Sequence, residues 1–404
     1  MYIQRDLEAK LRRYLGAREI LAIVGPRQCG KTTLMEHVFK GLKNAKFISF
    51  EDREALELFS KDISAFADIY LKGVDYLFID EFQYARKGGK QLKYLYDSFR
   101  TKMVVSGSSA PELSVQSLKY LVGRIFILNL YPLSFSEYLR YKNPRLFGIY
   151  ARSAFSEPVV ERLNSHYREF AVYGGYPRVA LARAPDEKRE VLKNIYNTYL
   201  LREIREILQL PDDFKLSQLM KILALQTGGI VNYNELSSSS GMAYHELKRS
   251  LNVLMKTFVC AESRPFFTNK KKELVKAPKV FFLDNGFRNT IAGNFQPIAD
   301  RPDSGQLNEN FVASELVKSG IELRYWRTKA KAEVDFIAES EGSLMPIEVK
   351  SSLSSPKLTR SFKNFLGEYR PEKGFVLSSS LVGKRKAASS SVEFLPIFAA
   401  GGLG

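Results

Sequence analysis

The stretch Gly25-Pro26-Arg27-Gln28-Cys29-Gly30-Lys31-Thr32-Thr33 decides the fold of the first part of this chain. It follows the pattern G-x-x-x-x-G-K-[ST], whose glycines let successive backbone N–H groups point at phosphate oxygens. The apolar run 20–24 precedes it, and a helical pattern over 34–39 follows it. This strand–loop–helix context predicts that all nine residues form a nucleotide-binding loop, rather than a plain glycine-rich turn.

The loop and the next apolar run predict the chemistry of hydrolysis. Lys31 is expected to reach the β- and γ-phosphates of ATP, and Thr32 to place its hydroxyl on Mg²⁺. The run Tyr76–Ile79 ends in Asp80 and Glu81. Asp80 is expected to hold the same Mg²⁺, and Glu81 to orient and polarise the attacking water. A phosphate loop followed by an acidic strand end favours nucleotide hydrolysis over passive binding.

Two further candidates lie beside the later apolar runs. Met103–Val105 leads into a serine-rich turn, where Ser108 is either a sensor of the γ-phosphate or part of a helix N-cap. Arg124 precedes the run 125–128 and is either an arginine finger, acting in cis or in trans, or a solvated side chain. Strands alternating with helices predict an α/β fold with a parallel sheet, with phosphate at the carboxyl ends of the strands.

Composition limits the remaining classes. A chain of 404 residues predicts two to four domains at about 100–200 residues each. The net charge of +17 favours an anionic partner, although a lysine-rich solubilising surface gives the same balance. Two cysteines exclude a disulfide framework and a four-cysteine zinc site. Without a signal-peptide core or an apolar run of about 18 residues, we expect a cytoplasmic protein with no membrane partner.

The order of the motifs resembles AAA-superfamily ATPases of archaea and bacteria that have a restriction-endonuclease-like C-terminal domain. The resemblance covers most of the chain and rests on GPRQCGKTTL at 25–34, YLFIDEFQ at 76–83, VVSGSSA at 104–110, LVGRIFILNLYPLSFSEYL at 121–139 and YGGYPR at 173–178. It implies that a helical lid follows the core. Pro177 matches the glycine-x-proline element that contacts the base in related signalling ATPases, and a tight turn between helices is the alternative.

The middle of the chain predicts a winged helix-turn-helix. Helical patterns over Lys215–Gln226, Tyr233–Ser238 and Tyr244–Phe258 are followed by two extended segments, 259–267 and 274–283. On the last helix the outward-facing residues are expected to be His245, Lys248, Arg249 and Asn252. Lys270, Lys271 and Lys272 would lie at the tip of the wing, where they can meet phosphates. Winged helices also bind proteins, so DNA and protein partners both stay open.

The C-terminal part predicts an acid–lysine site. The segment 333–338 alternates polar and apolar residues, and 344–350 is expected to be its partner strand. Period-two geometry places Glu348 and Lys350 on one face, which Asp335 can share. This set resembles the PD-(D/E)xK nuclease core, and Glu309 matches the acid on the helix of that family.

The resemblance implies the roles of these residues. Asp335 and Glu348 would hold a second Mg²⁺ or a Mn²⁺ ion, and Lys350 would stabilise charge or orient water. The proline that often precedes the aspartate in the family is Val334 here. Cleavage of DNA and a scaffold role without cleavage both stay open.

These patterns divide the chain into a P-loop ATPase core (1–133), a helical lid (134–210), a winged helix-turn-helix (211–283) and a restriction-endonuclease-like α/β domain (284–404). The expected function is Mg²⁺-dependent ATP hydrolysis coupled to action on DNA, in repair, recombination or defence. A homo-oligomer is expected if Arg124 acts in trans. The alternative is an ATP-dependent regulatory switch that binds a protein partner and has an inactive nuclease-like domain.

Overall fold

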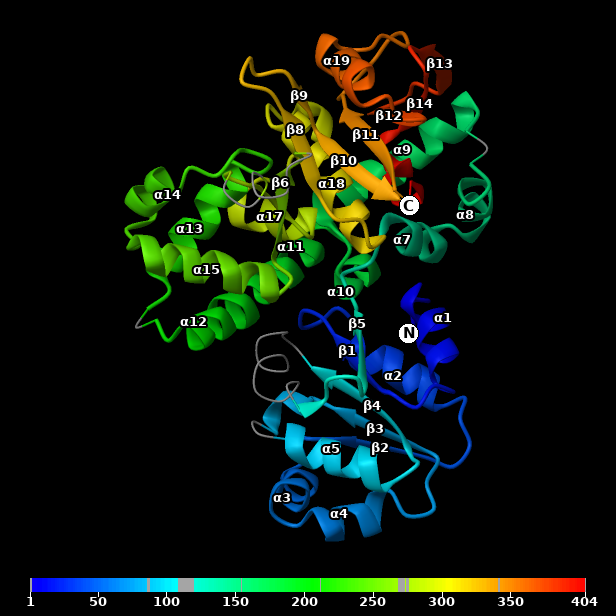
Figure 1. Cartoon of the computed structure of the whole chain (residues 1–404), viewed down its shortest axis with the longest axis vertical. Helices are drawn as coiled ribbons and strands as arrows, with labels where there is room; N and C mark the ends of the chain where they lie inside the picture. Colours follow the sequence, from blue (N-terminus) through cyan, green and yellow to red (C-terminus); the bar gives the residue numbers. More distant parts are fainter. Residues whose placement is uncertain are drawn as a thin grey trace. The chain divides into compact units, whose positions relative to one another are not determined.

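The computed structural model describes residues 2–85, 88–107, 120–153, 155–210, 212–267, 273, 276–340 and 342–403, and of 199–203 and 340 the backbone alone. Internal contacts divide the chain into two compact units, whose elements are labelled in Figure 1. The first unit holds 1–132 and 256–258, and the second holds 133–255 and 259–404. The phosphate-loop motifs lie in the first unit. The acid–lysine pattern lies in the second.

A parallel five-stranded sheet forms the centre of the first unit. Its order is β2-β3-β4-β1-β5, and every neighbouring pair is parallel, which confirms the predicted α/β sheet. Strand β4 lies between β1 and β3. The carboxyl ends of these three parallel strands therefore lie side by side at one end of the sheet. The strands are β1 (Ile20–Val24), β2 (Ala45–Ser49), β3 (Tyr76–Asp80), β4 (Lys102–Gly107) and β5 (Ile125–Asn129).

Helices cover both faces of this sheet, because successive side chains of a strand point to opposite faces. Leu21 packs in one core with residues of α1 (Leu7–Tyr14) and α2 (Lys31–Phe39). Ala22 belongs to the core on the other face. That core contains side chains from α3 (Arg53–Lys61), α4 (Ile63–Tyr70), α5 (Gly89–Ser98) and the 3₁₀ turn η1 (Phe82–Tyr84).

The second unit begins with a run of helices over the segment expected to be helical. Ser134 and Glu137 form a capping box that starts the first of them, which fixes where the chain enters this unit. The helices are α7 (Phe135–Lys142), α8 (Pro144–Tyr150), α9 (Glu157–Tyr173), α10 (Pro177–Leu181), α11 (Pro185–Asn194), the π-helical η3 (Ile195–Leu201) and α12 (Arg202–Leu208).

Three helices and a hairpin follow, and they share one apolar core. They are α13 (Phe214–Leu225), α14 (Tyr233–Ser240), α15 (Tyr244–Lys256) and the antiparallel pair β6 (Cys260–Pro265) and β7 (Lys279–Phe282). Strand β6 also pairs in parallel with β8 (Arg324–Arg327), and β8 pairs with β9 (Glu333–Val334). One sheet of order β7-β6-β8-β9 therefore joins the hairpin to the C-terminal region, a pairing that the local sequence pattern does not indicate.

A mixed sheet of order β10-β11-β12-β14-β13 completes the second unit. Its strands are β10 (Phe336–Ser340), β11 (Ser343–Val349), β12 (Lys373–Ser378), β13 (Gly383–Ala387) and β14 (Ser390–Pro396). The helices of this region are α17 (Asn285–Ala292), α18 (Ser304–Lys318) and α19 (Arg360–Tyr369), with the 3₁₀ turns η4 (Ile298–Asp300) and η5 (Ile397–Gly402). No helix in the described part of the chain is both long enough and apolar enough to span a bilayer.

Candidate functional sites

The phosphate loop joins β1 to α2, and its shape depends on two glycines. Gly30 has a φ of +96°, in the left-handed region that favours glycine, and is the N-cap of α2. A Cβ on Gly25 would lie 2.0 Å from the carbonyl oxygen of Leu130, so no larger residue fits this close approach. The loop and the first turn of α2 thus form the anion-binding arrangement that the sequence predicts.

Lys31 lies over the loop itself. Its ammonium is buried and donates hydrogen bonds to the carbonyl oxygens of Gly25 at 3.0 Å and Pro26 at 2.9 Å. A phosphate group in the loop would offer the same ammonium stronger, charge-assisted bonds. Arg27, Gln28 and Thr33 are exposed, whereas Cys29 is fully buried and burial raises the pKa of its thiol. Cys29 is therefore a core residue of the loop.

Asp80, the last residue of β3, connects this strand to the start of α2 and to the end of β4. Its Oδ2 accepts a hydrogen bond from Thr32 Oγ1 at 2.7 Å, and its Oδ1 accepts one from Ser106 Oγ. Hydroxyl and carboxylate oxygens are hard ligands that suit Mg²⁺, so the residues predicted to hold this ion fit it. Ser106, at the end of β4, completes the group. Ser108, the candidate in the turn after this strand, lies outside the described residues.

Glu81 leaves the sheet in an unusual backbone conformation. Its φ of +54° lies in the left-handed region, which few residues other than glycine adopt. Its N–H donates to Ser106 Oγ at 3.1 Å, and its carboxylate accepts a hydrogen bond from the Gln83 side chain. These bonds orient the carboxylate that is expected to act on the attacking water. Gln83 was not among the predicted site residues.

Arg124 lies at the other end of the parallel sheet, where the strands begin. Its carbonyl accepts a hydrogen bond from the N–H of Ile20, the first residue of β1, whereas the phosphate loop follows the last residue of that strand. The guanidinium pairs with Asp97 at 3.0 Å. This position does not support the cis role on the nucleotide of the same chain, because the length of β1 separates the two. The trans role stays a prediction.

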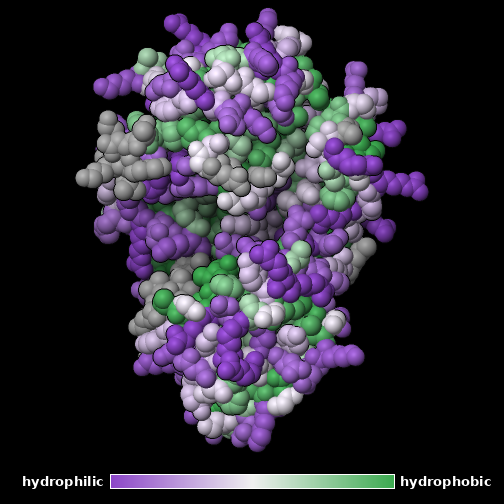
Figure 2. Space-filling view, turned by 45° about the vertical axis from the view of Figure 1, so that its right-hand side comes forward, coloured by the Kyte–Doolittle hydropathy of each residue, from purple (hydrophilic) through white to green (hydrophobic). Residues whose placement is uncertain are grey.

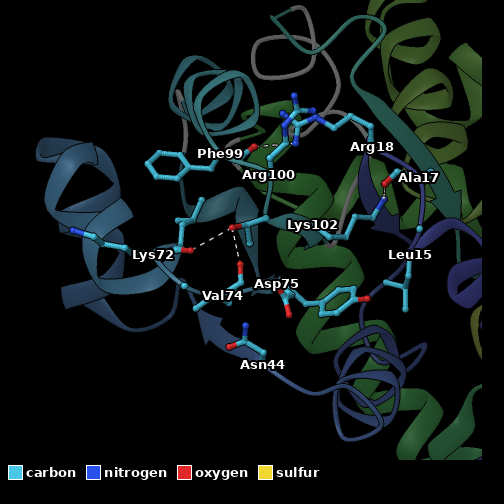
Figure 3. Close-up of a pocket in the computed structure, with 15 residues that line it drawn as sticks. Leu15, Ala17, Arg18, Asn44, Lys72, Val74, Asp75, Phe99, Arg100 and Lys102 are labelled. Carbon is cyan, nitrogen blue, oxygen red and sulfur yellow. Dashed lines mark hydrogen bonds between the residues drawn. The ribbon is translucent and has the colours of Figure 1, made fainter.

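A hollow of about 920 Å³ opens at this same end of the sheet and is shown in Figure 3. Residues 15–18, 44, 71–76 and 99–102 line it. Lys102 donates to the carbonyl of Ala17 at 2.8 Å, and burial lowers its pKa to about 8. Arg18 donates to the carbonyl of Phe99 at 2.9 Å. These bonds fasten the beginnings of the strands, and the hollow is separate from the phosphate loop.

The Gly174-Gly175-Tyr176-Pro177 motif packs against the start of α17. A Cβ on Gly174 would lie 2.2 Å from Asp284 Oδ1, and the Gly175 N–H donates to Asp284 Oδ2 at 2.7 Å. Pro177 is in the first turn of α10, where its fixed φ suits a helix start. The close contacts at this motif are sufficient to explain why glycine occupies positions 174 and 175. Contact of Pro177 with a nucleotide base stays a prediction.

In the second unit, Asp335 and Glu348 face the same side of a β-ladder. Phe336 pairs with Ile347 in the antiparallel register, so Asp335, one residue earlier, lies opposite Glu348. The Val349 N–H donates to Asp335 Oδ2 at 2.7 Å. Two predicted residues from separate strands are thereby brought together.

Glu348 is buried and both of its carboxylate oxygens have partners. Lys350 Nζ lies 2.9 Å from Oε1, and Thr359 Oγ1 donates to Oε2 at 3.0 Å. The neighbouring carboxylates raise the pKa of Lys350 against the effect of its own partial burial. This lysine is thus fixed in its charged form beside Glu348.

Glu309 approaches the same cluster from α18. Burial and the charge of Asp335 raise the pKa of Glu309 to about 7, and burial raises that of Asp335 to about 6. The next residue, Asn310, fixes the rotation of the helix. Its Oδ1 accepts from Thr227 Oγ1 at 2.8 Å and from the Phe282 N–H at 2.7 Å, and its Nδ2 donates to the Phe282 carbonyl at 3.0 Å.

Lys279, on β7, is a further member of this cluster that the sequence pattern does not indicate. Its side chain is 4% exposed and forms an ion pair with Glu333. Its charge lowers the pKa values of Glu309 and Asp335 more than that of Lys350 does, which opposes the effect of burial. No local motif marks Lys279, because only the sheet β7-β6-β8-β9 brings it near these acids.

Asp335 and Glu348 are the candidate metal ligands of this cluster. Within the described ranges, no group of three or more His, Cys, Asp or Glu side chains is arranged to hold a metal ion. Asp335 and Glu348 supply hard oxygen atoms, and lysines lie beside both.

Residues 17–139 match a family described as AAA domain. The phosphate loop, the acidic strand end and this match define the protein as a P-loop ATPase, and ATP as its nucleotide. Residues 164–297 and 304–398 match two further families, each described as a domain of unknown function (DUF8612 and DUF4143).

The chain is similar along most of its length to proteins from distant organisms. An uncharacterized protein of Haemophilus influenzae is 27% identical over 367 residues, 86% of each chain. One of Mycobacterium tuberculosis is 26% identical over 395 residues, which are 94% of this chain and 82% of the relative. Among solved structures, the Walker-type ATPase of Pyrococcus abyssi aligns at 16% identity and a TM-score of 0.48, over 72% of this chain and 96% of that chain.

Substitutions at Lys31 and Glu81 should separate binding from turnover. Lys31→Ala is expected to abolish ATP binding in calorimetry, because the loop loses its only ammonium. Glu81→Gln should keep binding and slow phosphate release by about 10²–10⁴-fold, since an amide cannot act as a base. Lys40→Ala, at the exposed far end of α2, is the matched control. Undiminished turnover in both site variants would refute the assigned roles.

Glu309 should make stability depend on pH. Its pKa rises from the usual 4.5 to about 7 in the folded chain, so the folded state binds more protons than the unfolded state between these values. Wild-type stability should therefore fall as pH rises through this window. Glu309→Gln, measured by urea unfolding with EDTA, should show a smaller fall, because only the raised pKa of Asp335 then contributes to it at this cluster.

The matched control is Glu190→Gln, on an exposed position of α11. It should follow the wild-type pH dependence. A stability difference between Glu309→Gln and wild type that stays constant from pH 4.5 to 7 would contradict the burial of an ionisable Glu309.

Proposed function

We propose that this ATPase acts on DNA, with α15 as the element that enters the major groove. The exposed face of α15 supports this role most directly. His245, Lys248, Arg249 and Asn252 are exposed on it, while Leu247 is buried in the core below. A polar, basic helix after a helix and a tight turn suits groove binding.

The cation at the centre of this face is held in place. Lys248 Nζ lies 3.7 Å from the ring centroid of Tyr233 and 5.6 Å from that of Tyr244. Cation–π contacts of this kind restrict a long side chain before it meets a ligand. The net charge of +17 adds long-range attraction for phosphates, and Figure 2 shows hydrophilic side chains over much of the molecular surface that faces the viewer.

Under this proposal the chain has the four parts that the sequence suggests: an ATPase core (1–133), a helical lid (134–210), a winged helix-turn-helix (211–283) and a restriction-endonuclease-like domain (284–404). The wing lysines Lys270, Lys271 and Lys272 lie outside the described residues. A homo-oligomer in which Arg124 completes the site of a neighbouring subunit belongs to the same proposal.

Lys248→Gln and Arg249→Gln should each weaken binding to duplex DNA. Each lost phosphate contact should reduce the slope of log affinity against log salt concentration by about one. Fluorescence anisotropy across a salt series measures both quantities. Lys363→Gln, an exposed lysine on α19, controls for the simple loss of charge. Unchanged affinity and slope in both variants would favour the alternative function, a switch that binds a protein partner.

A second candidate function, metal-dependent DNA cleavage, is favoured by the meeting of Glu309, Asp335, Glu348 and Lys350. Asp335 and Glu348 would hold Mg²⁺ or Mn²⁺, which would polarise a phosphodiester and activate water when bound. Lys350 would stabilise developing charge near the phosphate. Glu309 would add a further carboxyl group from α18. The ion pair of Lys350 with Glu348 keeps this ammonium at the cluster.

Asp335→Asn should abolish any cleavage of DNA supported by Mn²⁺ or Mg²⁺ and leave ATP hydrolysis intact. The amide keeps the shape of the side chain and removes the charge that holds the ion. Duplex, branched and single-stranded DNA are each incubated with and without ATP, and products are resolved on gels. Asp300→Asn, outside the cluster, is the matched control. Absence of cutting in the wild type on all substrates would leave a binding scaffold without nuclease chemistry.

A further inference from the structure

Arg5 contacts the phosphate loop from outside the motif. Its side chain is 5% exposed although it precedes the first helix. Nη1 donates to the carbonyl oxygen of Cys29 at 2.7 Å, and Nη2 donates to that of Tyr131 at 2.6 Å. One guanidinium therefore joins the loop to the chain that follows β5.

The contact of Arg5 with the phosphate loop is made to the peptide group between Cys29 and Gly30. The carbonyl of Cys29 and the N–H of Gly30 belong to one planar peptide, so fixing the carbonyl also fixes the direction of the N–H. A charged donor on the carbonyl polarises the peptide and strengthens the N–H as a donor to phosphate. The planar fork of arginine serves two acceptors at once, which a lysine matches less well.

The other acceptor belongs to a segment, 130–135, that leaves the ATPase sheet. Inside the first unit, the Leu130 N–H donates to the carbonyl of Val24 at 2.8 Å, one residue before the loop. The carbonyl of Leu130 is the atom that Gly25 approaches so closely. The beginning of segment 130–135 is thus in direct contact with the phosphate loop.

The end of segment 130–135 is anchored inside the second unit. The Leu133 N–H donates to the Gly175 carbonyl at 2.7 Å, and Lys318 Nζ donates to the Leu133 carbonyl at 3.1 Å. The Phe135 N–H donates to Glu315 Oε2 at 3.0 Å. Each end of the segment thus bonds within its own unit.

We propose that Arg5 is a positioning residue of the ATPase that holds the phosphate loop in its binding shape and ties it to segment 130–135. Nucleotide binding at the loop is therefore expected to stabilise the beginning of this segment, which lies in the first unit. The role goes beyond phosphate binding by the loop motif and does not depend on the proposed action on DNA.

The test compares Arg5→Met, Arg5→Lys and the control Arg12→Met, an exposed arginine of α1 that pairs with Glu8. Arg5→Met is expected to weaken ATP binding by about tenfold or more, because two hydrogen bonds from a charged donor are lost. Arg5→Lys should recover part of this loss, and Arg12→Met should match the wild type. Calorimetry with a non-hydrolysable ATP analogue and steady-state kinetics give the affinities, KM and kcat.

Hydrogen exchange tests the second part of the proposal. In the wild type the ATP analogue should slow amide exchange both in the loop and at position 130, whose N–H is bonded to Val24 within the first unit. In Arg5→Met, saturated with analogue, the added protection should persist in the loop and be lost at position 130, while positions 133 and 135 serve as internal controls. Wild-type affinity with wild-type protection would overturn the proposal, and so would a lower melting temperature with an unchanged KM. If Arg5→Met does not fold, Arg5→Lys is judged by the same criteria.

Discussion

The carboxylate of Asp80 is the point on which the ATPase site depends. It accepts hydrogen bonds from Thr32 at the start of α2 and from Ser106 at the end of β4. This is possible only because β4 lies between β1 and β3, so that three carboxyl ends meet at adjacent points. A strand order with β1 directly beside β3 would remove Ser106 from the group. Sheet topology therefore determines which oxygen-bearing side chains meet at Asp80, beyond what the loop motif alone provides.

Buried polar contacts play a similar part in the second unit. Asn310 joins α18 to β7 and, through Thr227, to the end of α13, and it thereby sets the direction of Glu309. Asp284 joins α17 to Gly175 in the same way. Buried polar groups need such partners, and the requirement is directional. These contacts fix one rotation for each helix, where apolar packing alone permits several.

Sequence reasoning predicted the elements with strong local signals and missed those made by distant pairing. The loop at 25–33, the acidic end of β3 and the parallel sheet follow from short patterns and are observed. The convergence of Asp335 and Glu348 follows from period-two alternation. Ser106, Lys279 and Arg5 are not marked by the local pattern as members of these sites, because their partners lie 24 to 126 residues away. Arg124 shows the converse, since the strand direction places it away from the phosphate loop of its own chain and leaves only the trans role as a prediction.

The pairing of β6 with β8 has a consequence for how the chain can be divided. A polypeptide ending at 283 would keep the three helices and the hairpin but would present β6 with one edge unpaired. Exposed strand edges recruit other chains, so such a fragment should associate with itself rather than remain a tractable monomer. The same argument applies in evolution. If the C-terminal region were exchanged for an unrelated one, the new region would have to supply a strand that pairs with β6 as β8 does. The two regions are therefore expected to be inherited together.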